Sequence, residues 1–474
     1  MSAGTAAQPA PPTPSPQRSG VWREAWRLSV PATLALLLHS GYRVNDQYWV
    51  QDLGAPAQAA LGLTSFVVIL NFAFVSLVHS GALARAARAC GAGDRPLLES
   101  VYSTTLKFGL TWFTIIGALG WLAGPLWVRA LGANGEVAAM GQDYLQVLYL
   151  CMPLIGMKPV IDAMFIAQGN TLVPMLLSVL SVGLNFVLNP LLIYGAGPVP
   201  AMGVAGAAWA TGAARGVAAL LGALLLVRLY GLRPKWKEAL HRAEVRAIAR
   251  IGWPMALSVA GYAGVFIVML KTTIEPFGET VQAGLGVAFN GVEAISYCGL
   301  MGPAIAVSSM VGRRLGAGDV AGAAQSVRAC LTMSCGIAAV ATVAFLAVPE
   351  RLAALYTGDP GVRAEAARYL WIVGWTQLAT AAQSVYEQAL AGAGRTLAMS
   401  LTNLAGNGVR IPLAWLFAHR LAWGPAGAWW AMNVSNLLKL GAIVAVFRRG
   451  GWRATRVPAA DLPQPPRQAC PPAS

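Results

Sequence analysis

Charged residues are scarce in this sequence. Asp, Glu, Lys and Arg make up only 11% of the 474 residues, whereas 56% are hydrophobic and the mean hydropathy is +0.57. A water-soluble domain carries about 25% charged residues, so this chain lacks the polar surface that such a domain needs. The shortage of charge excludes an ordinary soluble protein and favours membrane-spanning helices, each of which needs about 20 apolar residues.

The sequence also lacks the motifs of familiar enzymes. It has no Walker loop, no His-x-x-x-His zinc helix and no Gly-x-Ser-x-Gly elbow, and its 4 histidines are well separated. Its 6 cysteines have no spacing typical of a metal site or a disulfide framework. We therefore expect no enzyme activity, no metal and no cofactor, and transport without a nucleotide site would be driven by an ion gradient.

Long apolar runs take the place of these motifs, and the two halves of the chain repeat each other. GAGD stands at 91–94 and again at 316–319, 225 positions later (319−94), and Pro31 and Pro254 lie near the start of the first run in each half. Each half contains six candidate spans, too long and too rich in Gly and Ala for barrel strands. An even number of spans gives both halves the same orientation. We predict an all-α membrane protein whose twelve transmembrane helices form two pseudo-symmetric six-helix bundles around a central cleft.

Composition divides the chain into five parts. Residues 1–20 are rich in Pro, Ala and Ser and are predicted to be a disordered cytoplasmic tail, and 451–474 to be a Pro-rich cytoplasmic tail. Residues 21–228 and 247–450 are predicted to form the two bundles, and 229–246 a basic cytoplasmic linker between them.

Basic residues gather in the two tails, the linker and the even-numbered loops, within a net charge of +15. This distribution is the positive-inside bias, so it predicts a multi-pass protein of the plasma (inner) membrane with both termini in the cytoplasm. The basic clusters are interpreted as contacts with anionic lipid of the bilayer rather than with nucleic acid. Two separate bundles in one chain are compatible with a functional monomer.

An ordered set of weak motifs occurs in both halves. Arg-x-x-GAGD follows the second span of each half, Asn-x-x-x-x-Pro occupies 185–190, and Gly-x-x-Gly-Ala-x-x-Ala occupies 203–210. The set resembles the multidrug and toxic compound extrusion (MATE) family over about residues 20–450. The resemblance implies a secondary antiporter that exports small organic, often cationic, compounds in exchange for H⁺ or Na⁺. The wider superfamily also contains exporters and flippases of lipid-linked or anionic substrates, which are the alternative.

Coupling to an ion requires a group inside the membrane that binds and releases a cation. Asp46 resembles the carboxylate that the family carries in its first helix, and the alternative is a structural pair with Arg43 on the same helical face. Asn189 departs from the family, in which many members have Asp before the proline. Asn185 and Thr211 match the other polar positions of that site, so these side chains are predicted to hold H⁺ or Na⁺ with one carboxylate. The alternative for Asn185 and Asn189 is structural hydrogen bonding.

Glu293 is the second candidate for ion coupling because it has no basic neighbour one turn away along its helix. The alternative is a partner from another helix, such as Lys271 or Arg410. Asp162 and Glu387 are equivalent positions of the two halves (387−162 is 225) and are interpreted either as cleft carboxylates or as paired charges, with Lys158 beside Asp162.

Aromatic and basic residues inside the spans complete the candidates for a substrate cleft. Tyrosines near the acids are typical of stacking on organic cations, although simple packing is the alternative. Buried bases such as Lys271 and Arg410 instead favour an anionic or zwitterionic substrate. The predicted cleft residues are Tyr42, Tyr48, Asp162, Tyr262, Lys271, Tyr297, Glu387 and Arg410.

Overall fold

The protein is described by a computed structural model that covers residues 18–130 and 134–453. These residues are helical almost throughout, and within them the only β pairing is an isolated bridge between Ala196 and Val199. The predicted all-α class is confirmed.

The helices form six units in each half of the chain. The first half contains α1 (Arg18–Val50) with η1 (Gln51–Leu53), α2 (Ala55–Gly91), α3 (Arg95–Ala130), the bent pair α4 (Gly135–Leu150) and α5 (Met152–Ala167), α6 (Leu172–Tyr194) and α7 (Gly203–Tyr230). The second half begins with α8 (Arg242–Met269), η2 (Leu270–Ile274) and η3 (Glu275–Phe277), followed by α9 (Glu279–Leu285), η4 (Gly286–Glu293) and α10 (Ala294–Gly316). It continues with α11 (Val320–Ala347), the short α12 (Pro349–Ala354), α13 (Pro360–Gly374) with α14 (Gln377–Gly392), α15 (Thr396–Trp415) with η5 (Leu416–Arg420), α16 (Pro425–Arg448) and η6 (Gly451–Arg453).

Seven of these helical units are long and apolar enough to cross a membrane by themselves, and the bent pair of α4 and α5 makes an eighth. The other four units are α1, α2, the α13 and α14 pair, and α15 with η5. Three of them carry a charged residue within the helix, namely Asp46 in α1, Glu387 in α14 and Arg410 in α15. These charges lower the mean hydropathy of the three helical units. A spanning helix tolerates such a charge because it lies inside the protein rather than against lipid.

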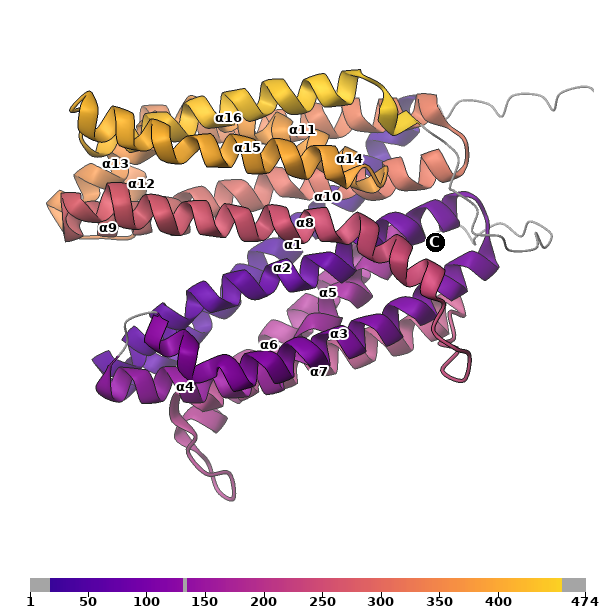
Figure 1. Cartoon of the computed structure of the whole chain (residues 1–474), viewed down its shortest axis with the longest axis horizontal. Coiled ribbons are helices and arrows are strands. Elements are labelled where there is room, and N and C mark those ends of the chain that lie inside the picture. Colours follow the sequence, from indigo (N-terminus) through magenta and orange to yellow (C-terminus); the bar gives the residue numbers. More distant parts are fainter. Residues whose placement is uncertain (1–17, 131–133, 454–474) are drawn as a thin grey trace, which may run out of the picture.

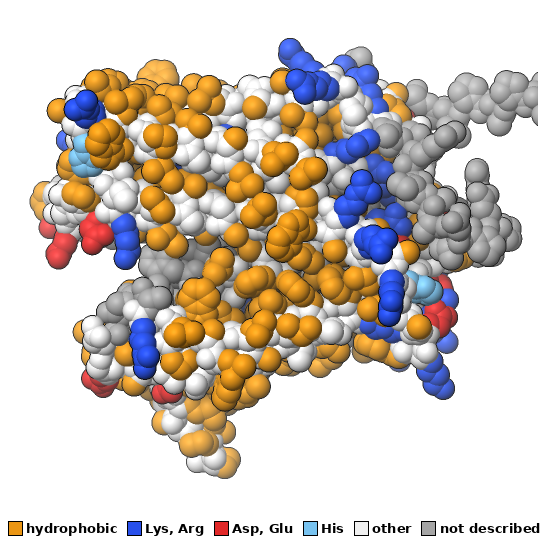
Figure 2. Space-filling model, in the orientation of Figure 1, with side chains coloured by type: hydrophobic (Ala, Val, Ile, Leu, Met, Phe, Trp, Pro, Cys, Tyr) orange, Lys and Arg blue, Asp and Glu red, His pale blue; other side chains and the backbone are white. Residues whose placement is uncertain are grey.

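The two halves form two bundles that lie together at one end of the molecule and separate toward the other (Figure 1). Helices α1 and α2 of the first bundle pack against α10 and α8 of the second. Both ends of the described chain lie at the closed end, since Val21 and Trp452 belong to one buried cluster. Lys and Arg side chains gather at this same end (Figure 2), which we call the basic end.

The repeated GAGD sequence forms the same turn in both bundles. The second glycine has a left-handed conformation, with φ of 67° at Gly93 and 80° at Gly318, and it ends the preceding helix. Asp94 then accepts a hydrogen bond from the Leu97 amide at 2.9 Å. Asp319 accepts one from the Gly322 amide at 2.7 Å, so each aspartate caps the next helix.

The first glycine of each GAGD brings the two bundles into backbone contact. A Cβ atom built on Gly91 would lie 1.8 Å from the carbonyl oxygen of Arg313, and one built on Gly316 would lie 2.2 Å from that of Arg88. These positions are equivalent in the repeat, so a single sequence motif makes both sides of a two-fold contact. Close packing through small residues is how helices associate within a bilayer, where burial of apolar surface gives no driving force.

Helices extend past the predicted bounds of the bundles, since α7 ends at Tyr230 and η6 occupies Gly451–Arg453. Helix α1 begins at Arg18, inside the predicted tail, because Val21 and Ala25 pack in the buried cluster at the basic end. Helix α8 begins at Arg242, inside the predicted linker, because Glu244 is buried against a residue of α2. The rest of the two predicted tails, 1–17 and 454–474, lies outside the described residues.

Replacing Gly91 with Ala should destabilise the closed arrangement of the bundles. The added methyl group would overlap the Arg313 carbonyl, and overpacking of this kind typically costs about 1–3 kcal/mol. We expect a lower thermal unfolding midpoint for the detergent-purified variant. Gly336→Ala is the matched control, because no atom lies within 4 Å of that Cβ position. Equal midpoints for the two variants would contradict the contact.

Candidate functional site

A buried carboxylate lies between α1, α6 and α7 of the first bundle. The Oδ1 atom of Asp46, on α1, accepts hydrogen bonds from Asn189 at 2.8 Å and from Asn185 at 3.4 Å, both on α6. Its Oδ2 atom accepts from the Thr211 hydroxyl of α7 at 3.4 Å. The carboxylate is only 7% exposed. The structure thus brings together the four residues predicted for this site, which we call the Asp46 cluster.

Neutral side chains provide the hydrogen bonds to the Asp46 carboxylate. Asn185 donates to Thr211 at 3.2 Å and accepts from Asn45 at 2.8 Å, so the amides form a connected network. Among the described side chains, none forms an ion pair with Asp46. The predicted alternative partner, Arg43, lies outside the described side chains. An acid held by amides and a hydroxyl can accept a proton or a small cation without first breaking a salt bridge.

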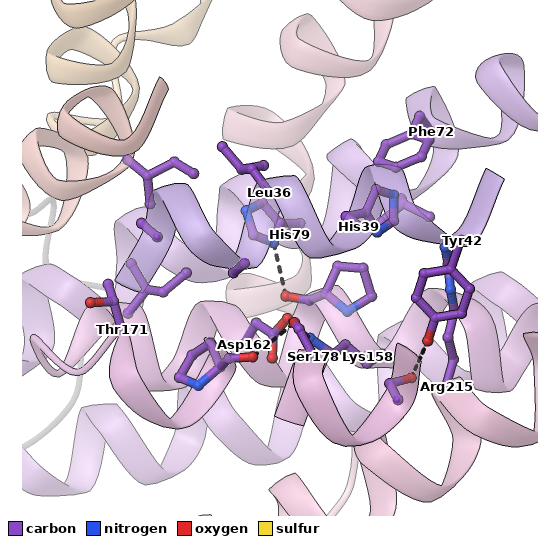
Figure 3. Close-up of a pocket in the computed structure, with 18 of the residues that line it drawn as sticks. Leu36, His39, Tyr42, Phe72, His79, Lys158, Asp162, Thr171, Ser178 and Arg215 are labelled. Carbon is purple, nitrogen blue, oxygen red and sulfur yellow. Dashed lines mark hydrogen bonds and ion pairs between the residues drawn. The ribbon is translucent and has the colours of Figure 1, made fainter. Parts of the chain in front are cut away.

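A cavity of about 280 Å³ lies in the same bundle, next to this cluster. Its walls come from α1, α2, α5, α6 and α7, with Ile305 of α10 as the contribution of the second bundle (Figure 3). Lys158 bridges Asp162 at 2.6 Å and Ser178 at 2.8 Å along one wall. The expected pairing of Lys158 with Asp162 is therefore present, and Asp162 also lines the cavity.

Aromatic side chains also line the cavity. Tyr42 is buried and hydrogen-bonded to Ser181, and the guanidinium carbon of Arg215 lies 4.8 Å from the centre of its ring. His39 and Phe72 continue this wall, with ring centres 5.6 Å apart. On α2, His79 shares a hydrogen bond of 2.9 Å with the carbonyl oxygen of Pro159.

The second bundle contains a different polar cluster around Glu293. One carboxylate oxygen accepts from the Tyr369 hydroxyl at 2.6 Å, and the other accepts from the Gln377 amide at 3.3 Å. Arg410 is only 3% exposed and donates to Ser435 at 3.0 Å and to Asn436 at 2.9 Å. The described partners of Glu293 are thus a phenol and an amide from α13 and α14 rather than a base.

The second bundle also contains a buried lysine on α16. Lys439 is 6% exposed and donates to Asn407 at 3.0 Å, whereas Glu387 accepts from Gln383 at 2.6 Å. Tyr262 is partly buried on α8.

Three predicted cleft residues have exposed side chains. Tyr48 is 56% exposed and Tyr297 47%, and Lys271 in η2 is also exposed. The predicted site residues did not include Arg215, Tyr369 or Gln377. Each is a polar residue inside an apolar span, and this feature of the sequence could have identified all three as candidates.

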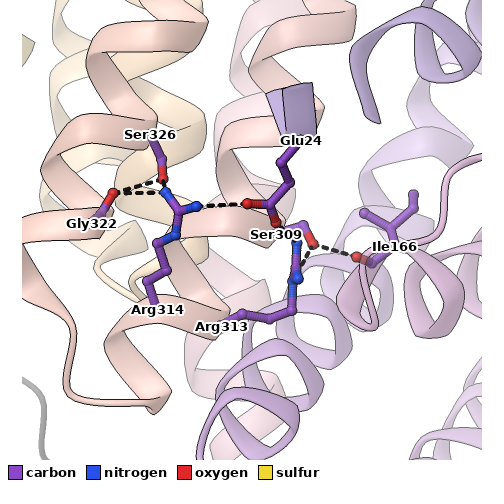
Figure 4. Close-up of polar contacts among 7 residues, drawn as sticks. All are labelled: Glu24, Ile166, Ser309, Arg313, Arg314, Gly322 and Ser326. Carbon is purple, nitrogen blue, oxygen red and sulfur yellow. Dashed lines mark hydrogen bonds and ion pairs between the residues drawn. The ribbon is translucent and has the colours of Figure 1, made fainter. Parts of the chain in front are cut away.

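Charged side chains join the two bundles at the basic end. Glu24 of α1 accepts from Arg313 and from Arg314 of α10, each at 2.6 Å (Figure 4). In a second contact the first bundle supplies the base and the second bundle the acid. Arg85 of α2 donates to both carboxylate oxygens of Glu244 on α8, at 2.8 and 2.7 Å. The Ser309 hydroxyl also donates to the Ile166 carbonyl across the interface. We call these contacts the basic-end latch.

Two repeated helical bundles with polar clusters buried inside their spans define an integral membrane transport protein. The MatE family model matches residues 31–191 and 254–416, together more than half of the chain, and the chain belongs to this family of transporters. The two matched segments begin at the two repeated prolines, so they coincide with the two halves of the repeat.

Relatives and solved structures agree with this assignment. The probable multidrug resistance protein NorM of Thermotoga maritima is 25% identical and covers 92% of this chain and 94% of its own length. The FAD transporter of Shewanella oneidensis is 24% identical, covering 72% of this chain and 76% of its own length. A structure described as the outward-facing conformation of a multidrug resistance MATE family transporter has a TM-score of 0.84 at 22% identity, covering 92% of this chain and 97% of that one. This likeness confirms the fold.

Replacing Asn189 with Asp should make the Asp46 cluster dependent on a cation. The amide now donates to Asp46 at 2.8 Å, and a carboxylate in its place would repel Asp46 unless a cation or proton lay between them. We expect Asn189→Asp to be less stable than wild type without Na⁺ and to gain more stability as Na⁺ is added. The measurement is the thermal unfolding midpoint against Na⁺ concentration, with choline holding the ionic strength constant.

The control for this experiment keeps the number of acids unchanged. The double variant Asp46→Asn with Asn189→Asp exchanges the acid and the amide of one hydrogen bond. Its unfolding midpoint should change with Na⁺ concentration as that of wild type does. If the three proteins respond equally, the two positions do not share a cation site.

Proposed function

We propose that this protein is a secondary antiporter that exports small organic compounds in exchange for H⁺ or Na⁺ by alternating access. Relatives named as multidrug resistance or multidrug export proteins support the export of organic compounds. The observation that carries the exchange is the Asp46 cluster. Its carboxylate is buried and its described hydrogen-bond partners are neutral, so a cation can bind there and change the charge of the site without first breaking an ion pair among the described residues.

Alternating access requires one end of the cleft to be closed while the other is open. By the positive-inside rule the basic end faces the cytoplasm, with both termini on that side of the plasma membrane. In this orientation the latch closes the cytoplasmic end, and the bundles separate toward the outside. Opening to the cytoplasm would break the ion pairs of Glu24 and Glu244 and separate the glycine contacts.

The polar cluster of the second bundle is the other candidate for coupling. Glu293 is held by Tyr369 and Gln377, again without a basic partner among the described residues. Either acid, or both, would gain the ion when the site faces outside and release it inside. Binding of the ion would change the hydrogen bonds around the acid and so weaken substrate binding on the outer side.

Organic cations are the first substrate class that we propose, since Asp46, Asp162, Glu293 and Glu387 all lie within the spans. Anionic substrates, including lipid-linked ones, are the second class. The observation that favours them is the set of bases in the same region, because Arg410 and Lys439 are 3% and 6% exposed. The relative named as an FAD transporter supports the second class.

Neutralising the coupling acid should abolish uphill transport. We expect everted vesicles to move ethidium against its gradient when either a proton or a Na⁺ gradient is imposed, and the gradient that works identifies the ion. Asp46→Asn should reduce this movement to the rate of vesicles without the protein, because the amide cannot carry the ion. The exposed Asp143 supplies the control variant, Asp143→Asn, which should transport normally.

The same assay with Glu293→Gln locates the coupling site. Loss in Asp46→Asn alone assigns coupling to the first bundle, and loss in Glu293→Gln alone assigns it to the second. Uphill transport that survives in the double variant would overturn the proposal.

Replacing Glu24 with Gln should open the basic end. Charge-assisted hydrogen bonds contribute about 1.5–3 kcal/mol each, enough to change a two-state population more than about tenfold. We expect spin labels placed at the exposed positions 229 and 449 to show a larger share of long distances by double electron–electron resonance. Glu238→Gln is the control, because the ion pairs of Glu238 stay within the linker. An unchanged distance distribution in Glu24→Gln would show that the latch does not hold the end closed.

A further inference from the structure

The cavity of the first bundle has more positive than negative charge. Its lining includes Lys158, Arg215 and a single carboxylate, that of Asp162. The ion pair of 2.6 Å between Lys158 and Asp162 leaves the guanidinium of Arg215 as the excess charge. No described carboxylate lies within ion-pair distance of Arg215.

Arg215 interacts electrostatically with both Asp46 and Asp162, but Asp46 already accepts from the Asn and Thr side chains of its cluster and Asp162 is paired with Lys158. The planar guanidinium instead lies over the Tyr42 ring at 4.8 Å. Tyr42 also takes part in a side-chain hydrogen bond with Arg215, so these contacts hold the group in one orientation. The guanidinium has five N–H donors, and those not used by Tyr42 suit a carboxylate. Figure 3 shows Arg215 and Tyr42 together at one side of the cavity.

The other wall contains an acceptor without a donor. The Oδ2 atom of Asp162 bonds to Lys158, whereas its Oδ1 atom is buried and has no hydrogen-bond partner. A buried carboxylate oxygen without a donor is rare in folded proteins and indicates a missing partner. Tyr42 and His39 also line the cavity, with Phe72 beside them, and these rings suit a flat aromatic body.

We propose that Arg215 makes this cavity selective for substrates that carry a carboxylate on an aromatic body, and that Asp162 faces the amino group of such a zwitterion. The inference rests on the proposed export function and names its substrate class. The substrate combines the two classes above, because one molecule would supply a carboxylate to the Arg215 guanidinium, which has no described ion pair, and an amino group to the unpaired oxygen of Asp162. Arg215 is then the residue that separates zwitterions from plain cations.

Two dyes that differ by one methyl ester test this assignment. Rhodamine 110 has a free carboxylate, and rhodamine 123 is its methyl ester with the same aromatic cation. We expect the purified protein to bind rhodamine 110 more tightly, measured by fluorescence polarisation. Arg215→Met should weaken rhodamine 110 binding by about tenfold or more, since a charge-assisted bidentate contact is lost, and should leave rhodamine 123 nearly unchanged.

Matched variants separate charge from folding. Arg228→Met removes an exposed base from the same helix and should change neither affinity. Arg215→Lys keeps the charge without the planar fork and should lie between wild type and Arg215→Met. Asp162→Asn should weaken both dyes, because both carry the amino groups that face it.

The outcomes distinguish this inference from the proposed function. Equal loss of both dyes in Arg215→Met, or tighter binding of rhodamine 123 by wild type, would overturn the inference even if gradient-driven export of rhodamine 123 proceeds. If rhodamine 110 binding depends on Arg215 but no gradient drives export of either dye, the binding site stands and the antiporter proposal fails.

Discussion

Helices α2 and α10 approach so closely at the basic end that only glycine fits between their backbones. Gly91 faces the Arg313 carbonyl and Gly316 faces the Arg88 carbonyl, and any side chain at either position would overlap the partner helix. This contact brings α1 against α10 and α2 against α8, where the ion pairs of the latch form. It also determines which end of the cleft is closed, so the accessibility of every buried polar group depends on it.

The two bundles share a fold but differ in the chemistry of their interiors. Asn185 and Asn407 occupy equivalent positions of the repeat, yet Asn185 donates to the carboxylate of Asp46 and Asn407 accepts from the ammonium of Lys439. In a membrane each buried charge needs a local partner, so a change of sign in one bundle changes the polar groups around it. The first bundle therefore suits a cation at Asp46, and the second bundle combines Glu293 with buried bases.

Contacts within one helix were predictable, and contacts between helices were mostly not. The pairing of Lys158 with Asp162 follows from a spacing of four residues, which places two side chains on one helical face. The grouping of Asp46 with the α6 amides came from the resemblance to the family rather than from spacing. The contacts of Glu293 with Tyr369 could not be predicted, because they depend on how far neighbouring helices are rotated and shifted along their axes.

The internal repeat, the scarcity of charge and the long apolar runs were sufficient to establish the membrane class, the twelve helical units and the two bundles. These features are local, because a helix in lipid satisfies its own backbone hydrogen bonds whatever its neighbours are. The closed basic end, the Asp46 cluster and the cavity beside Arg215 arise only when the helices pack. Side-chain packing sets helix tilt and rotation, and so it decides which few polar residues of a largely apolar chain meet one another.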